Sequence, residues 1–338
     1  MNHMNRMSNN AGIDLSAALW LAGDDYDYVD KPNYISVTTL IKPIRQIILG
    51  MRVAKIAAEN PEAVVPVDII DRFKSRLGQT LHTGVEVSWK ENYRTSMQKL
   101  GYPKRVIDMV RINPEKEEPD TIPVYTEQRT EREVRIGELV YTVGGKIDLI
   151  IEGRLRDVKS TTVFKYTSQS GVGQWKLQGS LYRWLNPGKV HHDEFLVQYL
   201  LVDWARAFAG RDPNYPAHAA PSRSVRLMTV EETDKWVKDK LRLLTQLADA
   251  PDDQLPECSE EDLWRSAPVF KYYASGDTTK RATKNFDTAQ EANAFRAEKG
   301  KGVVVEKPGT VKACGYCPCA PICGQYQRLL VAGDIASD

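Results

Sequence analysis

Apolar positions recur along the chain in two periods, and the alternation of these periods predicts an α/β protein. Short apolar or β-branched runs are typical of strands, and they occur at 124–134, 139–143, 146–151, 155–158, 194–203 and 224–228. Apolar residues three or four positions apart are typical of helices, and they occur at 67–101, 173–185 and 231–248. Thr229 and Glu232 precede the last helix at the spacing of a capping box. The pattern therefore predicts a central mixed sheet flanked by helices.

The helix predicted at 67–101 carries a row of residues spaced four apart, so that Gly78, His82 and Glu86 share one face. A glycine inside a helix costs about 1 kcal/mol, and it is understandable where another backbone or a ligand approaches closely. His82 is therefore a candidate ligand, and the alternative is a packed or surface histidine. The basic residues that follow form either a phosphate-facing rim or a solvated helix face: Lys90, Arg94, Lys99, Lys104, Arg105 and Arg111.

The stretch from Gly145 to Lys159 predicts a β-hairpin in which two apolar strands flank the turn pair Glu152-Gly153. Asp148 lies inside the first strand, and strand alternation points Asp157 and Lys159 to the same face. An acidic residue inside a core strand costs several kcal/mol unless a cation satisfies it. Two carboxylates that converge beside an ammonium group therefore indicate a site for a hard divalent ion. The alternative is a solvated hairpin whose charges face water.

Composition limits the function by what it excludes. The chain has 338 residues, of which 42% are hydrophobic, and this is enough for one large domain or a domain with an appendage. Its net charge of +1 rules out a global polycationic field, so any contact with nucleic acid must come from a local groove. No apolar run reaches the roughly 18 residues that span a bilayer, and residues 1–10 lack the apolar centre of a secretory signal. We therefore expect a cytoplasmic protein without membrane contact.

The changes in character along the chain predict three segments. Residues 1–33 are expected to be a flexible leader, 34–250 a folded core, and 251–338 a small module held by its cysteines. Four of the five cysteines fall between Cys314 and Cys323. Cysteines in a cytoplasmic protein are more typical of metal binding or packing than of disulfides.

These residues together resemble the RecB-type exonuclease branch of the PD-(D/E)XK nuclease superfamily. The parts of the resemblance are Gly78-x3-His82-x3-Glu86 on a helix, Gly145-x2-Asp148 and Asp157-x-Lys159 on the hairpin, and Gln178-x3-Tyr182 on the next helix. A single D…DxK occurs often by chance, whereas four pieces in the order of the family are specific. The resemblance covers residues 34–203 and implies a restriction-endonuclease-like core, with the cysteine module packed on it.

The resemblance implies a metal centre at the hairpin. His82 from the helix would be a metal ligand, together with Asp148 and Asp157 from the two strands. Lys159 would orient the attacking water or stabilise the pentacovalent phosphate. Carboxylates and water suit Mg²⁺, and an imidazole ligand makes Mn²⁺ competitive.

Further residues would complete this site. The resemblance implies that Gln178 and Tyr182 line it and hold the substrate or the catalytic groups. One strand earlier, Glu127 or Glu131 is an additional acidic candidate. Phosphodiester hydrolysis needs an in-line water, a metal ion that lowers its pKa, and positive charge near the leaving oxygen. The predicted side chains are consistent with these needs.

The cysteines extend the resemblance. Cys314-x2-Cys317-x5-Cys323 is similar to the three-cysteine pattern of iron–sulfur members of this branch, such as AddB-type and CRISPR-associated exonucleases. Those families supply a fourth cysteine near the amino terminus in a Cys-Pro pair, where this chain has Lys42-Pro43. Cys258 is the favoured fourth ligand, as in phage-encoded members; Cys319 is the alternative, but its position two residues after Cys317 is awkward. Four thiolates fit a [4Fe–4S] cluster or a tetrahedral Zn²⁺ ion, and the resemblance favours the cluster.

The sequence thus predicts a metal-dependent DNA exonuclease of phage or mobile-element type that acts on single-stranded or duplex ends. Expected partners are DNA and a recombination or replication protein. A competing hypothesis is a non-catalytic DNA-end-binding or recombination-partner protein that keeps the fold. The complete Asp, Asp, Lys and His set counts against it, because a binding-only protein has no need to keep buried charges. A third hypothesis is a zinc-ribbon scaffold protein, and metal analysis separates it from an iron–sulfur protein.

Overall fold

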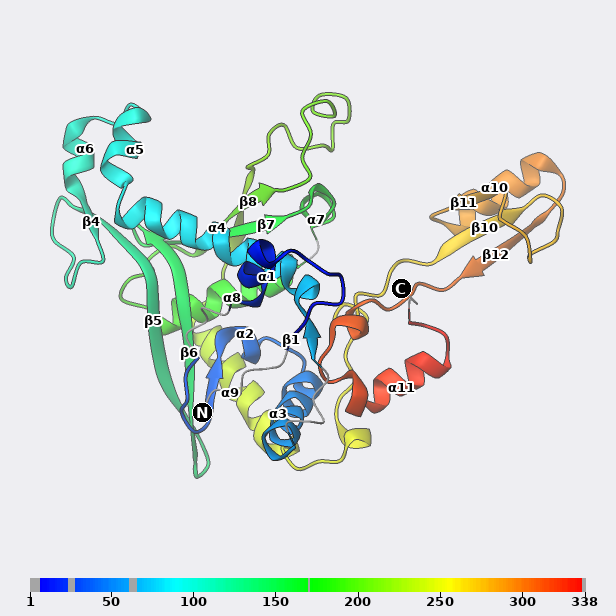
Figure 1. Ribbon diagram of the computed structural model, residues 1–338, viewed down its shortest axis with the longest axis horizontal. Coiled ribbons are helices and arrows are strands. Elements are labelled where there is room, and N and C mark those ends of the chain that lie inside the picture. Colours follow the sequence, from blue (N-terminus) through cyan, green and yellow to red (C-terminus); the bar gives the residue numbers. More distant parts are fainter. Residues whose placement is uncertain (1–6, 24–27, 61–65, 170, 336–338) are drawn as a thin grey trace. The chain divides into compact units, whose positions relative to one another are not determined.

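The computed structural model describes residues 7–23, 28–60, 66–169 and 171–335. It divides into two compact units (Figure 1). Unit 1 comprises Met1–Ile41 and Val64–Thr245, and unit 2 comprises Lys42–Ala63 and Gln246–Asp338. No helix among the described residues is long and apolar enough to cross a membrane.

Unit 1 is built on a seven-stranded mixed sheet. Its strands are β2 (Tyr34–Ser36), β4 (Val110–Ile112), β5 (Ile122–Ile136), β6 (Leu139–Ile151), β7 (Arg154–Thr161), β8 (Glu194–Leu201) and β9 (Ser222–Arg226). The order is β4-β5-β6-β7-β8-β9, with β2 paired to β6. The β5–β6–β7 meander is antiparallel, whereas β7 and β8 are parallel and are therefore joined by a crossover through a helix. The long β5–β6 hairpin dominates one side of the sheet in Figure 1.

Helices flank this sheet. They are α1 (Leu15–Ala22), α2 (Val37–Leu40), α4 (Phe73–Lys90), α5 (Tyr93–Lys99), α6 (Lys104–Met109), α7 (Val163–Thr167), α8 (Val172–Leu185) and α9 (Val230–Leu247). Helix α4 packs on β5 and β7, and α8 packs on β5, β6 and β9. The predicted α/β class with a central mixed sheet between helices is therefore confirmed.

Several local predictions are confirmed by hydrogen bonds and backbone angles. Glu152 and Gly153 have φ of 50° and 74°, as a two-residue hairpin turn requires. The capping box at the start of α9 is reciprocal. The Thr229 amide donates to the Glu232 carboxylate over 2.8 Å, and the Glu232 amide donates to Thr229 Oγ1 over 3.1 Å.

Two elements differ from the predicted pattern. The helix expected at 67–101 is a 3₁₀ turn (Ile69–Arg72) followed by α4 and α5, which are separated at Glu91-Asn92. The break lets Tyr93 and Met97 of α5 pack against the cluster of Val110, Val124 and Leu149 on the sheet. The strands expected at 139–143 and 146–151 are one strand, β6.

Gly144 and Gly145, in the middle of β6, are explained by close neighbours. A Cβ on Gly144 would lie 2.5 Å from the Tyr34 hydroxyl, and a Cβ on Gly145 would lie 2.8 Å from the Tyr182 ring. Only a residue without a side chain lets both rings approach the strand so closely.

The segment predicted to be a flexible leader also contains regular structure. It includes α1 and the short strand β1 (Met7–Ser8), which pairs with β3 (Val67–Asp68). Asp14 caps α1 by accepting from the Ser16 amide over 3.0 Å. Residues 1–6 and 24–27 lie outside the described part.

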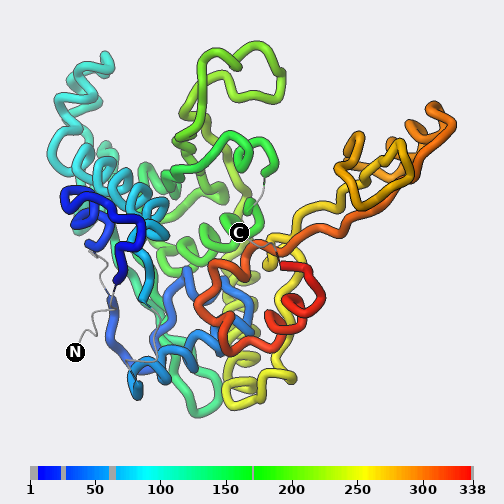
Figure 2. Tube along the Cα trace, turned by 45° about the vertical axis from the view of Figure 1, so that its right-hand side comes forward, coloured from blue at the N-terminus to red at the C-terminus, as the bar shows by residue number. Residues whose placement is uncertain are grey.

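Unit 2 combines one helix from early in the chain with the whole C-terminal segment. Its elements are α3 (Ile44–Glu59), β10 (Val269–Tyr273), β11 (Lys284–Phe286), α10 (Ala289–Lys299), β12 (Val303–Lys307) and α11 (Gly324–Val331). Strand β10 is central and antiparallel to β11 and β12. In Figure 2, β10 and β12 carry α10 away from α11, which belongs to the same unit.

Arg45 explains why α3 belongs to this unit rather than to the segment 34–250. Its side chain is only 2% exposed, and its guanidinium donates to Asp252 Oδ1 (2.6 Å) and to three backbone carbonyls, of Asp252 (2.8 Å), Leu255 (2.7 Å) and Pro256 (3.1 Å). A buried cation that is fully hydrogen-bonded holds its partners tightly, because losing it would leave them unsatisfied.

We expect Arg45→Met to destabilise the protein by about 3–5 kcal/mol, since it leaves the Asp252 carboxylate and three backbone carbonyls without the hydrogen bonds that Arg45 donates. Urea denaturation would measure the loss. Lys55→Met is the matched control because Lys55 lies on the same helix, is 78% exposed and has only a 4.0 Å ion pair with Glu59. Equal midpoints for the two variants would contradict the role given to Arg45.

Candidate active site

Three potential metal ligands from three elements of unit 1 converge at one point. His82 comes from α4, Asp148 from β6 and Asp157 from β7, and one ligand atom from each lies within 4.8 Å of the other two. His82 Nδ1 is 3.2 Å from Asp148 Oδ2. Lys159 completes the cluster with its Nζ 2.6 Å from Asp157 Oδ2. The structure thus brings together the four residues that the hairpin and helix patterns singled out.

The register of the sheet produces this convergence. The antiparallel β6–β7 ladder ends with the pair of Leu149 and Arg156, and Asp148 and Asp157 are the next residues beyond this pair on the two strands. Ligand atoms of the two acids lie within 4.8 Å of each other. Two carboxylates at this spacing repel each other when both are ionised, unless a cation lies between or beside them.

The β5–β6 ladder is interrupted opposite Asp148. Its regular pairs resume on either side of Glu127, and Glu127 has φ of +53°, which is unusual for a residue with a side chain. Consecutive side chains of a regular strand point to opposite faces, yet Asp148 contacts His82 and Leu149 packs by Trp89, both on α4. The irregularity at Glu127 therefore accompanies a local departure from alternation that lets Asp148 reach the helix.

Asp157 is the most deeply buried member of the cluster. It is 3% exposed; its Oδ2 lies 2.6 Å from Lys159 Nζ, and its Oδ1 has no hydrogen-bond partner among the described residues. Burial raises the pKa of Asp157 to about 7; the Lys159 charge opposes this rise, and the negative charge of Asp148 adds to it. A buried carboxylate beside a second one is a typical place for a cation.

In Asp148 and His82, hydrogen bonds and neighbouring charges outweigh the effect of burial on the pKa. Burial acts to raise the pKa of Asp148, but the hydrogen bond from His82 and the positive charges of His82 and Lys159 bring it down to about 2. The pKa of His82 is raised, chiefly by its hydrogen bond to Asp148 and against the effect of burial. A proton on His82 therefore competes with a metal ion for the imidazole.

The predicted lining residues are also in place. Gln178 and Tyr182 lie one turn apart on α8, and Gln178 Nε2 donates to the Tyr182 hydroxyl over 3.3 Å. Both line a cavity of about 320 Å³ that also contains His82, Asp148 and Lys159. Pockets of this size accommodate small ligands.

Of the two further acidic candidates, only one is at the site. Glu127 lines the cavity and is ion-paired with Lys146, and burial raises its pKa. Glu131 forms an ion pair with Lys31 and does not line the cavity. Strand alternation alone could not separate them, because the left-handed backbone at Glu127 is not visible in the sequence.

Sequence reasoning missed one residue beside the ligands. Arg156, which immediately precedes Asp157, lines a crevice together with His82, Asp148 and Glu86. Its Nε is buried without a hydrogen-bond partner among the described residues. The only available signal was a basic residue within a strand next to the Asp-x-Lys motif, and alternation assigned it to the face opposite Asp157.

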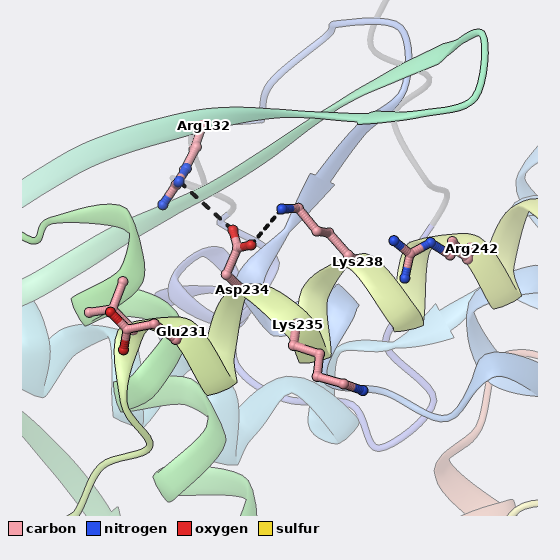
Figure 3. A pocket seen from close by; sticks show the side chains of 7 residues that line it. Arg132, Glu231, Asp234, Lys235, Lys238 and Arg242 are labelled. Atoms are coloured by element: carbon pink, nitrogen blue, oxygen red, sulfur yellow. Dashed lines mark ion pairs between the residues drawn. The ribbon is translucent and has the colours of Figure 1, made fainter.

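A second cavity of unit 1, about 400 Å³ in volume, lies between β5 and α9 (Figure 3). Its central acid, Asp234, accepts a hydrogen bond from the Trp184 indole (3.0 Å) and is ion-paired with Lys238 (2.6 Å) and Arg132 (3.8 Å). The Arg132 guanidinium also stacks on the Trp184 ring at 4.5 Å. Because this acid is already neutralised by the protein, the cavity is a weaker candidate for a metal centre than the cluster at Asp157.

The five cysteines of unit 2 line a common cavity of about 60 Å³. Cys258, Cys314, Cys317 and Cys323 are partly exposed, whereas Cys319 is 2% exposed and its thiol donates to the Gln46 carbonyl over 3.6 Å. Cys319 therefore already has a partner in the protein. The assignment of Cys258 as the fourth ligand stays a prediction.

Buried polar residues fix the positions of these sulfur atoms. Gln325 on α11 brackets Cys258, accepting from its amide (2.8 Å) and donating to its carbonyl (3.0 Å). From α3, Arg45 Nη1 and Gln46 Nε2 face the sulfurs of Cys323 (3.9 Å) and Cys317 (4.0 Å). Donors aimed at sulfur stabilise thiolates, as metal ligation requires.

Hydrogen bonds, neighbouring charges and burial shift the pKa values of the thiols. The hydrogen bond with Cys319, followed by smaller effects that include the charge of Lys42, lowers the pKa of Cys317 to about 6. Burial raises the pKa of Cys258 to about 12 and also raises that of Cys314. The Lys42-Pro43 pair thus supplies positive charge close to the sulfurs.

Comparison with known proteins adds little to this geometry. No family model matches the chain, and no curated protein matches it in sequence. Among solved structures it is similar to one described as "Crystal structure of SSO0001", with a TM-score of 0.40 and 17% identity over 67% of this chain and 81% of that chain. A likeness of this size carries no argument about function, which therefore rests on the site itself.

The raised pKa of Asp157 predicts a stability that depends on pH. An aspartate with its ordinary pKa of 3.8 when unfolded and about 7 when folded takes up a proton on folding between these pH values. Stability is therefore lost as the pH rises through this window. In the metal-free protein, Asp157→Asn should be more stable than wild type by a few kcal/mol at pH 8, and by much less at pH 4.

Melting temperatures measured in EDTA across pH 4–8 would test this expectation. Asp234→Asn is a control of opposite sign, because a hydrogen bond from Lys238 lowers the pKa of Asp234 and its stabilising effect is lost as the pH falls. Parallel pH profiles for wild type and Asp157→Asn would contradict the conclusion that burial raises the pKa of Asp157.

Proposed function

We propose that this protein is a metal-dependent DNA nuclease that hydrolyses phosphodiester bonds at DNA ends, with a restriction-endonuclease-like core of the PD-(D/E)XK type. One observation carries the proposal: ligand atoms of His82, Asp148 and Asp157 converge within 4.8 Å, beside the Lys159 ammonium. Carboxylate and imidazole donors around one point suit Mg²⁺ or Mn²⁺. Lysine next to such a centre suits a reaction in which negative charge develops.

The donor set fits a divalent cation. The buried carboxylate of Asp157 next to a second acid is costly without one, and His82 offers a neutral nitrogen above its own pKa. When bound, the ion would lower the pKa of a water molecule and polarise the phosphoryl oxygens.

The other groups of the site would act on the substrate and water directly. Lys159, held by Asp157, would place its ammonium against a non-bridging phosphate oxygen as water adds and the bond from phosphorus to the leaving oxygen breaks. Gln178 and Tyr182 offer an amide and a hydroxyl that can orient the strand or the water. The proton lost by water passes to solvent, and solvent protonates the leaving oxygen.

The cysteines support a second, structural part of the proposal. Cys258, Cys314, Cys317 and Cys323 would hold a [4Fe–4S] cluster that ties 313–323 and α11 to Cys258 and α3. Four thiolates also fit a tetrahedral Zn²⁺ ion, and the resemblance to iron–sulfur members of the nuclease branch favours the cluster. A module with so little core gains its stability from such a group.

Substitution of the ligands should separate activity from folding. We expect Asp148→Ala and Lys159→Ala to lower Mg²⁺- or Mn²⁺-dependent cleavage of DNA by at least about 100-fold while the protein stays folded. End-labelled single- and double-stranded oligonucleotides would measure the rates and the polarity, and circular dichroism would report folding.

The exposed ion pair of Lys235 and Asp239 on α9, 2.6 Å apart, provides matched controls. Lys235→Ala and Asp239→Ala should leave the cleavage rate unchanged. A wild-type protein that binds DNA ends but cleaves none with either metal would favour the non-catalytic end-binding protein instead.

The cluster makes a separate prediction about metal content. Protein purified without oxygen should contain about four iron atoms per chain and absorb visible light. Cys258→Ser should lose iron and stability, whereas Cys319→Ser should keep both, because Cys319 hydrogen-bonds to the protein. One zinc atom per chain, or equal loss of metal in the two variants, would rule out this ligand set.

A further inference from the structure

Arg156 lies next to the candidate metal centre and has no hydrogen-bond or ion-pair partner among the described residues. Its side chain lines the same crevice as His82 and Asp148, and its Nε is buried. An arginine can donate five N–H hydrogens, so such a position leaves much of its binding capacity unused.

The nearby acids that could have neutralised Arg156 form ion pairs with other residues. Two carboxylates line the crevice besides Asp148: Glu127 is ion-paired with Lys146, and Glu86 is ion-paired with Lys90. Glu152 acts on Arg156 only at longer range. The described part of the chain therefore supplies no ion-pair partner for this guanidinium, and a partly buried charge in that state costs free energy.

The other arginine of β7 differs from Arg156 because it has an ion-pair partner. Arg154, two residues earlier, is ion-paired with Glu194 on the adjacent strand at 3.8 Å. It does not line the crevice beside His82 and Asp148. Of these two arginines, the one beside the metal ligands is the one that lacks an anion.

Arg156 itself is only partly buried, although its Nε is enclosed. Tyr102, in the connection between α5 and α6, interacts electrostatically with Arg156 and is 50% exposed. Its exposed ring offers a surface on which a base can stack.

We propose that Arg156 binds a backbone phosphate of the nucleic-acid strand that occupies the active site and thereby positions the strand beside the metal ligands. The inference rests on the proposed nuclease function, which it deepens by assigning a binding residue for the strand. A guanidinium matches the geometry of phosphate oxygens in a bidentate manner, and a phosphate is the anion that the substrate brings. Arg156 is therefore a positioning residue rather than a catalytic one.

Binding measured without cleavage tests the proposal directly. A fluorescein-labelled oligonucleotide would be titrated in Ca²⁺ over a range of salt concentrations, with wild type, Arg156→Gln, Arg156→Lys and Arg154→Gln. Arg156→Gln should weaken binding about 10-fold at low salt and reduce the slope of log K against log salt by roughly 0.7–0.9. Arg156→Lys should keep the slope, and Arg154→Gln should match wild type.

Kinetics and stability separate this role from a structural one. In Mg²⁺, Arg156→Gln should raise KM about 10-fold with a much smaller change in kcat. Its stability in urea should equal or exceed that of wild type, because an unpaired buried charge has been removed. A destabilised variant with an unchanged salt slope would overturn the assignment.

The outcomes also distinguish this proposal from the one on which it rests. If wild type cleaves DNA while Arg156→Gln keeps the same KM and salt slope, the assignment of Arg156 is wrong and the nuclease proposal stands. If wild type neither binds nor cleaves the oligonucleotides, both proposals fail.

Discussion

The burial of Asp157 close to Asp148 is the constraint on which the architecture of the candidate site depends. Two neighbouring acids on adjacent strands are tolerated because Lys159 contacts Asp157 and His82 contacts Asp148. The compensation remains incomplete, since Asp157 Oδ1 has no hydrogen-bond partner among the described residues and the pKa of Asp157 is raised. A divalent cation bound here would relieve this unfavourable charge, and the relief would contribute to its affinity.

Features that depend on local sequence were predictable. The turn at Glu152-Gly153 and the alternation between Asp157 and Lys159 depend only on neighbours in the chain, and so does the capping box at Thr229. The spacing of four residues between Gly78, His82 and Glu86 indicated His82 as a ligand. These signals were enough to assemble the candidate site, because the hairpin register follows from its two-residue turn.

Features that depend on distant contacts were not predictable. The left-handed backbone of Glu127 interrupts the β5–β6 ladder opposite Asp148, and the Glu127 side chain is ion-paired with Lys146 of β6, which no local pattern indicates. The lack of a partner for Arg156 among the described residues likewise becomes apparent only when the positions of the surrounding acids are known. The membership of α3 in unit 2 is decided by Arg45, a basic residue in an apolar helix that sequence periodicity would assign to the surface.

The interleaving of the two units affects how the chain can be divided. The backbone passes from one unit to the other at 41–42, 63–64 and 245–246. A fragment that ends before Asp252 would retain α3 but lose the carboxylate and carbonyls that Arg45 binds. A single proteolytic nick or a simple C-terminal deletion therefore cannot release either half intact. Engineering unit 1 as a separate polypeptide would require excising α3 and rejoining the chain across the gap.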